Sequence, residues 1–243
     1  MTADSKTLRQ TNQRFYDDLW SGVKLIDPAR FNTWPLVNRL AASSPARLEV
    51  GPGMRPRLPV ADTCFADISK PALDKLAASG GICHQAAIDC LPFADNSFDL
   101  ICALDIIEHV EDDKAALAEL CRVAKPGAIM LISTPLHPED WTPFDDFVGH
   151  YRRYTPEALH QLLDDHSLQV EKSSGFGMKP KSSSMVNFGM RQLRDNPRTS
   201  LWLYNRVLMP LGLYFQKPLI LNEGLVDTGN ISDVFMLCRL NKS

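Results

Sequence analysis

The chain lacks several features that mark particular classes of protein. None of its six cysteines forms a CxxC pair, so we expect free, buried thiols rather than disulfides or a metal site. The formal net charge is −3 with both signs interspersed, which argues against nucleic acid as a partner. The first residues, MTADS, lack the basic and then apolar order of a secretory signal. Together these absences predict a cytoplasmic protein, because reduced thiols suit the cytosol.

Long uninterrupted apolar runs are also lacking. The most apolar stretch, residues 201–215, contains Asn205, Arg206 and Pro210, and Gln216 and Lys217 follow it. A membrane-spanning helix needs about 20 mostly apolar residues, so we expect no stable membrane insertion. The stretch belongs to a helical insertion at about residues 182–221. Three interpretations stay open for it: a lid over a hydrophobic small molecule, the face of a homodimer, or a helix lying on a membrane surface.

What the chain does contain is a series of short apolar segments that alternate with helical patterns. Strands are predicted at residues 48–50, 64–67, 82–88, 98–104 and 128–133, around Val170 and at 234–240. Helices are predicted from Ser69 to Gly80, over 112–124 and from Thr155 onward, with Ser69 and Thr155 as caps. This alternation predicts an α/β fold with a doubly wound, mostly parallel sheet of seven strands. Residues 1–44 are expected to be helical and to precede one domain that spans 45–243.

Polar residues and glycines stand where four of the predicted strands end: Gly51–Gly53, Asp67, Asp89 and Ala103–Asp105. Ligands of open α/β sheets bind beyond the carboxyl ends of the strands. Glycine lets a ligand approach the backbone closely, and a carboxylate can accept the protons of a ribose diol or of an adenine amine. A tight turn, a helix cap and a solvated loop aspartate are the simpler alternatives.

The glycine turn differs from the one that binds dinucleotides. That fingerprint, G-x-G-x-x-G, opens a helix whose positive end holds a pyrophosphate. Here the order is Gly51-Pro52-Gly53-Met54-Arg55, so the third glycine is missing, and Pro56 and Pro59 leave room for little more than one helical turn. A nucleoside ligand without a diphosphate therefore fits this turn better.

Four motifs, taken in order, carry a resemblance to a known family. They are LEVGPG at 48–53, ADIS at 66–69, DCLPFADNSFD at 89–99 and IIEHV at 106–110. Over about residues 45–178 the chain resembles the class I S-adenosylmethionine-dependent methyltransferases, and within them the branch of the ubiquinone and menaquinone methyltransferases. GHYRRYT at 149–155 is similar to a stretch found in many bacterial members. The resemblance implies S-adenosylmethionine, which has no phosphate, as cofactor and S-adenosylhomocysteine as product.

The resemblance also assigns roles in the cofactor site. Glu49 is expected to organise the glycine loop and to face the amino-acid end of the cofactor, which passes Gly51 and Gly53. Asp67 would hold the ribose, and Asp89 would bind the adenine amine. Further contacts are expected from Ile68 on the adenine, from the backbone of Cys90 or Leu91 on its ring nitrogens, from Ala103 and Leu104 beside the methionine portion, and from Asp105 at the cofactor ammonium or the acceptor. Residues 1–44 would form a lid, with Tyr16 covering the donor or, alternatively, packing in the core.

Methyl transfer to a small-molecule acceptor is the function that the resemblance implies, and the acceptor is apolar or lipid-like if the insertion forms a lid. The alternative is a non-catalytic or regulatory protein that binds S-adenosylmethionine. A general base is needed only when the acceptor must lose a proton. His137 and His109 are the candidates, with a purely structural role as the alternative for each.

A third histidine, His150, precedes the pair Arg152 and Arg153, which either binds an anionic acceptor or forms ion pairs. One further polar set matches no metal-binding template, so no metal is expected: His137, Asp140, Asp145 and His150.

Overall fold

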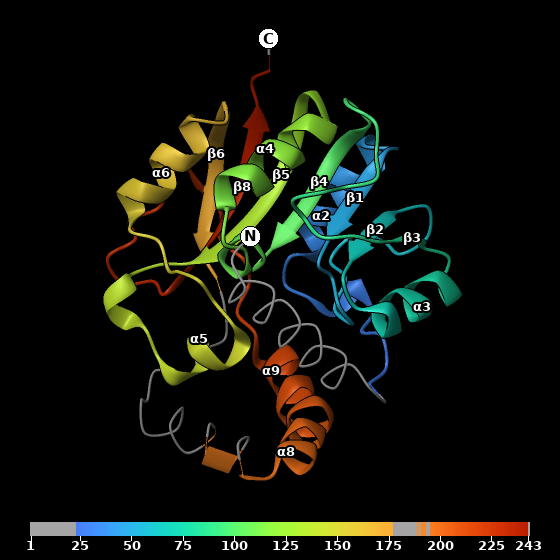
Figure 1. The fold of residues 1–243 in the computed structure, drawn as a ribbon, viewed down its shortest axis with the longest axis vertical. Helices are drawn as coiled ribbons and strands as arrows, with labels where there is room; N and C mark the ends of the chain where they lie inside the picture. Colours follow the sequence, from blue (N-terminus) through green and yellow to red (C-terminus); the bar gives the residue numbers. More distant parts are fainter. Residues whose placement is uncertain (1–22, 177–188, 190, 193–194, 243) are drawn as a thin grey trace.

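A single eight-stranded sheet forms the centre of the computed structural model, which describes residues 23–176, 189, 191–192 and 195–242 (Figure 1). The strand order is β3-β2-β1-β4-β5-β8-β6-β7. The strands are β1 (Arg47–Val50), β2 (Cys64–Asp67), β3 (Ile82–Gln85), β4 (Phe98–Leu104), β5 (Ala124–Pro135), β6 (Leu168–Gly175), β7 (Asn222–Glu223) and β8 (Asp233–Leu240).

The sheet is mostly parallel, which confirms the predicted fold class. Strands β3, β2, β1, β4 and β5 pair in parallel, and β8 is antiparallel to both β5 and β6. The eighth strand, β7, adds two residues antiparallel to β6 at the edge. Seven strands were predicted, because a two-residue strand is too short to show a periodic pattern.

Two strand boundaries differ from the prediction by three residues or more. β3 ends at Gln85 rather than at Ile88, and Asp89 lies in a turn. The apolar pattern continues past Gln85 because Ile88 is buried in the core even though it is outside the ladder. β5 begins at Ala124, because Ala124 pairs with Phe98 before the ladder shifts register. The Lys125-Pro126-Gly127 segment therefore lies inside this long strand.

The helices over the described residues are α2 (Trp34–Ser43), α3 (Lys70–Ala78), α4 (Asp113–Val123), α5 (Pro143–Val148), α6 (Pro156–Asp164), α8 (Pro197–Leu203) and α9 (Met209–Phe215). A π-helical segment, η4 (Tyr204–Leu208), joins α8 to α9, and three 3₁₀ turns are η1 (Pro28–Arg30), η2 (Ile107–His109) and η3 (Pro138–Asp140). The Thr155 hydroxyl accepts from the Ala158 N–H at 3.1 Å, which confirms the predicted cap of α6. Ser69 stands at the N-cap of α3, but its side chain makes no capping bond.

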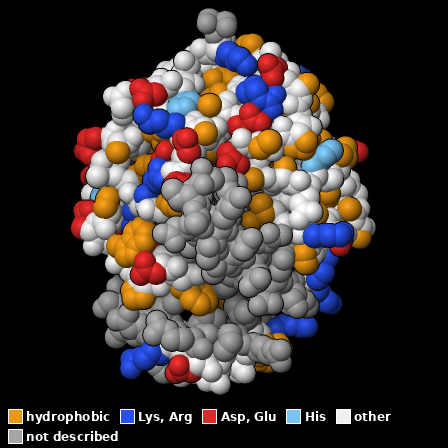
Figure 2. Space-filling view, in the orientation of Figure 1, with side chains coloured by type: hydrophobic (Ala, Val, Ile, Leu, Met, Phe, Trp, Pro, Cys, Tyr) orange, Lys and Arg blue, Asp and Glu red, His pale blue; other side chains and the backbone are white. Residues whose placement is uncertain are grey.

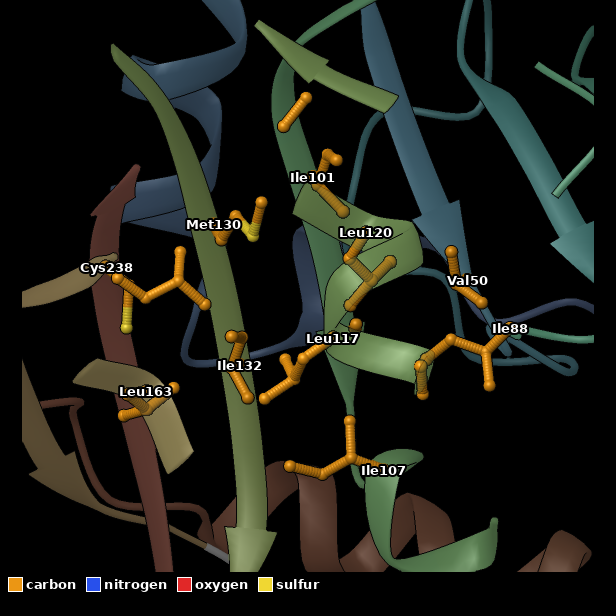
Figure 3. Close-up of a cluster of buried hydrophobic side chains, with 14 of the residues drawn as sticks. Val50, Ile88, Ile101, Ile107, Leu117, Leu120, Met130, Ile132, Leu163 and Cys238 are labelled. Atoms are coloured by element: carbon orange, nitrogen blue, oxygen red, sulfur yellow. The ribbon is translucent and has the colours of Figure 1, made fainter. Parts of the chain in front are cut away.

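Helices cover both faces of the sheet. On one face, α4 and α6 bury Leu117, Leu120 and Leu159 against Ile101 and the rest of a large apolar cluster (Figure 3). On the other face, α2 buries Leu36 and Val37 against side chains that alternate with the first set: Leu100, Cys102, Leu131, Phe235 and Leu237. Because successive side chains of a strand point to opposite faces, β4 is apolar on both sides, as its continuous pattern predicts.

The carboxyl ends of β4 and β6 point toward the side of the sheet where α5, α8 and α9 lie (Figure 1). The described part of the insertion is thus at the edge where the ligand site is expected. Residues 1–22, including Tyr16, lie outside the described residues, as do parts of the insertion.

The molecular surface agrees with the even charge composition. On the face shown in Figure 2, described side chains of both charge signs lie among hydrophobic ones. Among the described residues, no helix is long and apolar enough to span a membrane. All six cysteines are free, as predicted, but only Cys102 and Cys238 are fully buried, and Cys90 is exposed because it lies in a loop rather than in a strand.

Candidate cofactor and active site

The glycine turn after β1 adopts a backbone that other residues rarely take. Gly51 has φ +66° and Gly53 has φ +52°. The Gly51 N–H donates to the Ala66 carbonyl at 2.8 Å, and a Cβ on Gly51 would lie 2.7 Å from Cδ1 of Ile106. Between β1 and β2 the chain forms a turn and no helix. The Arg55 N–H donates to the Pro52 carbonyl at 2.9 Å and closes this turn. The prediction of little more than one turn is confirmed.

Glu49 holds the loop that follows this turn. Its buried carboxylate accepts from the N–H groups of Arg57, at 2.8 and 3.0 Å, and of Leu58, at 2.9 Å. Burial raises the pKa of the Glu49 carboxyl to about 7, although the hydrogen bonds from Leu58 and Arg57 act in the opposite direction. The role of Glu49 at the amino-acid end of the cofactor stays a prediction.

Asp67, at the end of β2, joins the glycine turn to the start of α3. One carboxylate oxygen accepts from the Gly53 N–H at 2.9 Å, and the other accepts from the Ser69 N–H at 2.8 Å. The residue is 7% exposed. The Ile68 carbonyl accepts from Nε2 of Gln85 at 3.0 Å, so the same corner is also tied to β3. The geometry therefore fixes the Asp67 carboxylate at the point where the turn and two strand ends meet.

Asp89 lies in the loop after β3. The Ala86 N–H donates to the Asp67 carbonyl at 3.1 Å, and Asp89 is three residues further, a reach of at most about 11 Å. The Cys90 N–H donates to Ala87 at 3.1 Å, and the Leu91 N–H donates to the Glu119 carboxylate at 2.7 Å. A bond from either N–H to an adenine ring nitrogen therefore requires that donor to change its partner.

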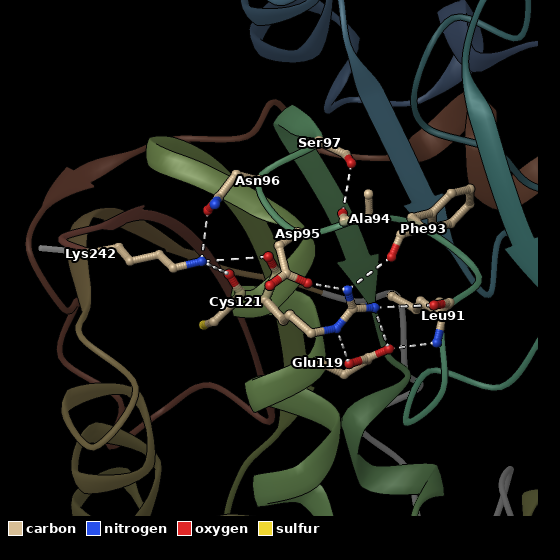
Figure 4. A network of polar contacts seen from close by, with 10 residues as sticks. Leu91, Phe93, Ala94, Asp95, Asn96, Ser97, Glu119, Cys121 and Lys242 are labelled. Carbon is tan, nitrogen blue, oxygen red and sulfur yellow. Dashed lines mark hydrogen bonds and ion pairs between the residues drawn. The ribbon is translucent and has the colours of Figure 1, made fainter.

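Arg122 on α4 fixes this loop through polar contacts with Leu91, Phe93, Asp95 and Glu119, which Figure 4 labels. No sequence pattern pointed to this residue. Its guanidinium donates to both Glu119 oxygens at 2.7 and 2.8 Å, to the Phe93 carbonyl at 2.8 Å, to Asp95 at 2.6 Å and to the Leu91 carbonyl at 3.1 Å. The hydrogen bonds that Arg122 donates to Glu119 and Asp95 raise its pKa. A Glu–Arg pair three residues apart is common on helix surfaces, so its spacing gave no signal of this role.

Asp105 stands at the tip of β4, next to the buried Ala103 and the partly buried Leu104. It has φ +51°, and its N–H donates to the carbonyl and to the hydroxyl oxygen of Ser133, both at 3.0 Å. The Ser133 hydroxyl donates in turn to the Asp105 carboxylate at 2.8 Å. Asp105 is exposed, so its carboxylate is held in place and accessible at the edge where the other strand tips end.

Arg57 is a second residue that the sequence did not single out. Its guanidinium carbon lies 3.6 Å from the centroid of the Phe31 ring and 6.0 Å from that of Phe176. Burial lowers the pKa of Arg57, and the charges of Glu49 and Asp105 act against that change. The Arg57 cation thus interacts electrostatically with two acids of the proposed site. No local motif indicates this role of Arg57, because Phe31 and Phe176 come from distant parts of the chain.

His137, the first candidate base, is tied down after β5. Its Nε2 lies 2.9 Å from the Thr228 carbonyl, and its Nδ1 lies 3.5 Å from Glu139. Its backbone has φ +62°, and its N–H donates to the Tyr154 carbonyl at 2.8 Å. Because Nε2 faces a carbonyl, it carries the proton, and Nδ1 is the ring atom left to accept one. A catalytic role stays a prediction, and the backbone contact matches the structural alternative.

His109, the second candidate, lies in η2 beside Glu108 and His150. Burial, together with the nearby His150, lowers the pKa of His109 to about 3. A ring that is so hard to protonate is a weak general base at neutral pH. The geometry therefore favours a role for His109 as a neutral imidazole.

Arg152 and Arg153 form ion pairs, which supports one of the two alternatives considered for them. Arg153 donates to both oxygens of the buried Asp145 at 3.0 Å and to the Leu136 carbonyl at 3.1 Å. Arg152 pairs with Asp113 at 2.7 Å. Burial acts to raise the pKa of Asp145, but hydrogen bonds from His150, Arg153 and Thr142 outweigh it and hold the pKa below its usual range. Both guanidinium groups are thus already used within the protein.

Comparisons with known proteins point to the methyltransferases. Residues 48–132 match the family model described as a methyltransferase domain. The fold resembles an S-adenosylmethionine-dependent methyltransferase from Mesorhizobium loti, with TM-score 0.53 and 14% identity over 88% of this chain and 100% of that one. It also resembles the [4+2]-cyclase SpnF, with TM-score 0.55 and 16% identity over 86% of this chain and 81% of that one.

Part of the chain is also similar in sequence to curated methyltransferases. The ubiquinone/menaquinone biosynthesis C-methyltransferase UbiE of Francisella tularensis subsp. novicida is 36% identical over 90 residues, which are 35% of this chain and 36% of the relative. The demethylmenaquinone methyltransferase of Renibacterium salmoninarum is 41% identical over 77 residues, 32% of this chain and 31% of the relative. The matches thus span about a third of these relatives' length.

The predicted class is confirmed over the matched region. The chain carries a methyltransferase domain of the class I S-adenosylmethionine-dependent type, with relatives like UbiE. Domains of this type take S-adenosylmethionine as cofactor and release S-adenosylhomocysteine.

Proposed function

We propose that this protein transfers a methyl group from S-adenosylmethionine to a small-molecule acceptor in the cytoplasm. One observation carries the proposal: the Asp67 carboxylate accepts a hydrogen bond from the Gly53 N–H, which joins the acid at the end of β2 to the glycine turn after β1. A carboxylate fixed beside such a turn suits a ribose diol, since charge-assisted hydrogen bonds contribute roughly 1.5–3 kcal/mol each.

The shape of the turn supports a methyl donor over a dinucleotide. Without a helix after Gly53, the turn offers no helix N-terminus for a diphosphate, which the sulfonium cofactor does not need. The methyl group of that cofactor is already activated, so the protein mainly positions the two reactants and excludes water. Asp105 and Nδ1 of His137 are the groups proposed to take a proton where the acceptor must lose one.

The insertion supports an apolar acceptor. Met209 and Leu213 of α9 are buried against Phe31, and Tyr204 accepts a hydrogen bond from Arg55 of the glycine loop at 3.3 Å. These contacts favour the lid interpretation, in which α9 borders the space beside the cofactor. Tyr214 and Phe215, which are 80% and 73% exposed, keep the homodimer and the membrane-surface interpretations open. The exclusion of nucleic acid stays a prediction as well.

The second candidate is a protein that binds S-adenosylmethionine without transferring its methyl group. The observation in its favour is the fold similarity to SpnF, whose name assigns it a [4+2] cyclisation. A tritiated-methyl assay over fractionated small-molecule extracts separates the two: methyl transfer to an extracted compound supports the enzyme, and cofactor binding without transfer supports the alternative.

Two substitutions test the cofactor site by calorimetric titration with S-adenosylmethionine. Asp67→Ala removes the carboxylate that is proposed to hold the ribose, and we expect affinity to fall at least tenfold. Asp89→Ala is expected to act in the same direction but less, and the exposed Asp74→Ala on α3 serves as the control. Unchanged affinity in both site variants would refute the assignment.

A further inference from the structure

A cluster of three metal-binding side chains lies between η2 and the residues after α5. Glu108 and His109 follow β4, and His150 comes from the segment that follows α5. One ligand atom from each residue, a carboxylate oxygen or an imidazole nitrogen, lies within 4.8 Å of the other two. Over the described part of the chain, this is the set of histidine, cysteine and acidic residues that meets this spacing. The set considered from the sequence, with His137 and Asp140, does not come together in this way.

The distances within the cluster suit a shared ion better than a direct ion pair. Oε1 of Glu108 lies 4.0 Å from Nε2 of His150, too far for a hydrogen bond. The ring centroids of His109 and His150 are 4.6 Å apart, and the two ring planes are nearly perpendicular. Ligands at roughly 2.1 Å around a tetrahedral ion are about 3.4 Å from one another, so small side-chain rotations would bring these atoms onto one ion.

Burial makes the arrangement a built site rather than a surface coincidence. Glu108 is 1% exposed, and the His150 side chain is 7% exposed. A carboxylate that is held away from water beside two imidazoles needs a compensating positive charge or strong hydrogen bonds. A divalent cation at the centre of the three groups would supply that charge.

The groups behind the cluster orient one of its imidazoles. Nδ1 of His150 donates to Oδ1 of Asp145 at 2.8 Å, which leaves Nε2 to point toward Glu108. Asp145 is itself fixed by two bonds from Arg153 and by the hydroxyl and N–H of Thr142, at 2.7 and 2.8 Å. A histidine that ligates a metal almost always donates its other ring N–H to a carboxylate or carbonyl in this manner.

We infer that Glu108, His109 and His150 bind one divalent transition-metal ion through two imidazole nitrogens and a carboxylate oxygen. Two nitrogens and one oxygen suit zinc, iron(II) or cobalt(II) rather than magnesium or calcium, which prefer oxygen ligands. Three protein ligands leave a coordination position open for water or another molecule. The inference does not depend on the proposed methyl transfer, because metal binding is measured without cofactor or acceptor.

Cobalt(II) alone, titrated into the metal-stripped full chain, tests the inference. We expect one ion to bind per chain, with visible absorption bands of a nitrogen and oxygen environment and without the thiolate charge-transfer band that cysteine ligands would give. His150→Ala, His109→Ala and Glu108→Gln are each expected to lower the affinity for cobalt(II) at least tenfold. His160→Ala, which changes an exposed histidine on α6, is the matched control and is expected to bind as the unchanged protein does.

Three results of the cobalt(II) titration would contradict the proposed metal site. The inference would be overturned if the unchanged protein did not bind one cobalt(II) ion per chain, or if its spectrum showed a thiolate band. It would also be overturned if the three ligand variants and the control bound cobalt(II) with equal affinity. The unchanged protein alone decides the first two, so a variant that fails to fold does not leave the question open. Calorimetry with S-adenosylmethionine on the metal-stripped protein separates failure of this site from failure of the proposed function.

Discussion

Glu49 shows how a single residue of this site has its chemistry set by burial. Its carboxylate is buried, where it accepts hydrogen bonds from the N–H groups of Arg57 and Leu58, and its pKa is still raised to about 7. The protonated form is therefore favoured in the folded protein relative to the unfolded chain. The stabilising contribution of this raised pKa is fully present below the unfolded value of 4.5 and is lost as pH rises through 7.

Glu49→Gln tests this linkage. The unfolding free energy of the unchanged protein should fall as pH rises from 5 to 8, because Glu49 loses its proton. The amide does not titrate, so we expect this fall to be about 2 kcal/mol smaller in the variant. Urea unfolding at the two pH values measures the difference. Glu223→Gln, which changes an exposed carboxylate on β7, should shift the unfolding free energy equally at both. A constant effect of Glu49→Gln across this range would show that Glu49 is ionised throughout.

The residues that the sequence identified and those that it missed differ in how their roles arise. Gly51, Gly53 and Asp67 stand at the ends of two strands that are consecutive in the chain and adjacent in the sheet, so local pattern and topology place them together. Arg57 and Glu108 depend on partners that are distant in the sequence: Phe31 and Phe176 for Arg57, and His150 for Glu108. Only the folded chain shows these contacts, because no periodicity encodes them.

At the scale of elements, the loop after β3 shows how a helix fixes the position of a segment that is proposed to bind the cofactor. Arg122 and Glu119 of α4 bind the carbonyls of Leu91 and Phe93 and the N–H of Leu91. The Asp89 loop is thereby attached to a helix whose other side is packed in the core through Leu117 and Leu120. The position of Asp89 thus depends on α4.

Arg122→Met should release this loop. We expect affinity for S-adenosylmethionine to fall several-fold and amide hydrogen exchange at residues 89–97 to speed up, while the fold persists, since the methionine keeps the aliphatic stem. Calorimetry and exchange measured by mass spectrometry report the two effects. Arg239→Met is the control, because Arg239 also pairs with a glutamate, Glu171, but on β8 and β6. Exchange at 89–97 that is equal in both variants would contradict the argument.

Elements with strong local patterns were predicted well, and those that depend on tertiary context were not. β4 and α4 follow from an apolar run and from helical spacing. The end of β3 was placed too late, because Ile88 is buried outside the ladder. The short α5 was not predicted at all. It has a capping box between Thr142 and Asp145, but it is too short for a helical apolar face to be recognised.

At the scale of the whole molecule, segments from the two ends of the described chain meet beside the glycine loop. The Asn32 N–H donates to the Gln216 side chain at 2.9 Å, and the Asn32 amide donates to the Lys217 carbonyl at 2.8 Å. Phe31, Met209 and Leu213 form a small apolar cluster at the same place. Because Arg57 stacks on Phe31, this cluster connects the insertion to the edge of the proposed site.

Leu213→Ala tests whether this contact holds a lid. The substitution removes buried side-chain volume from the cluster, a loss of about 2 kcal/mol where the site cannot collapse. We expect faster amide exchange at Asn32 and less tritium transferred to acceptors, with affinity for S-adenosylmethionine nearly unchanged. Leu211→Ala, an exposed position of the same helix, should leave all three readings as they are. Equal transfer in the two variants would argue against a lid at α9.

The central claim is that a fixed carboxylate at the end of β2 holds the sugar of an adenosyl sulfonium beside the glycine turn. A crystal structure of the complex with S-adenosylhomocysteine tests it most directly. The account predicts both ribose hydroxyls within hydrogen-bond distance of Asp67 and the amino-acid portion running past Gly51 and Gly53. A ligand bound elsewhere, or a ribose that does not contact Asp67, would contradict it.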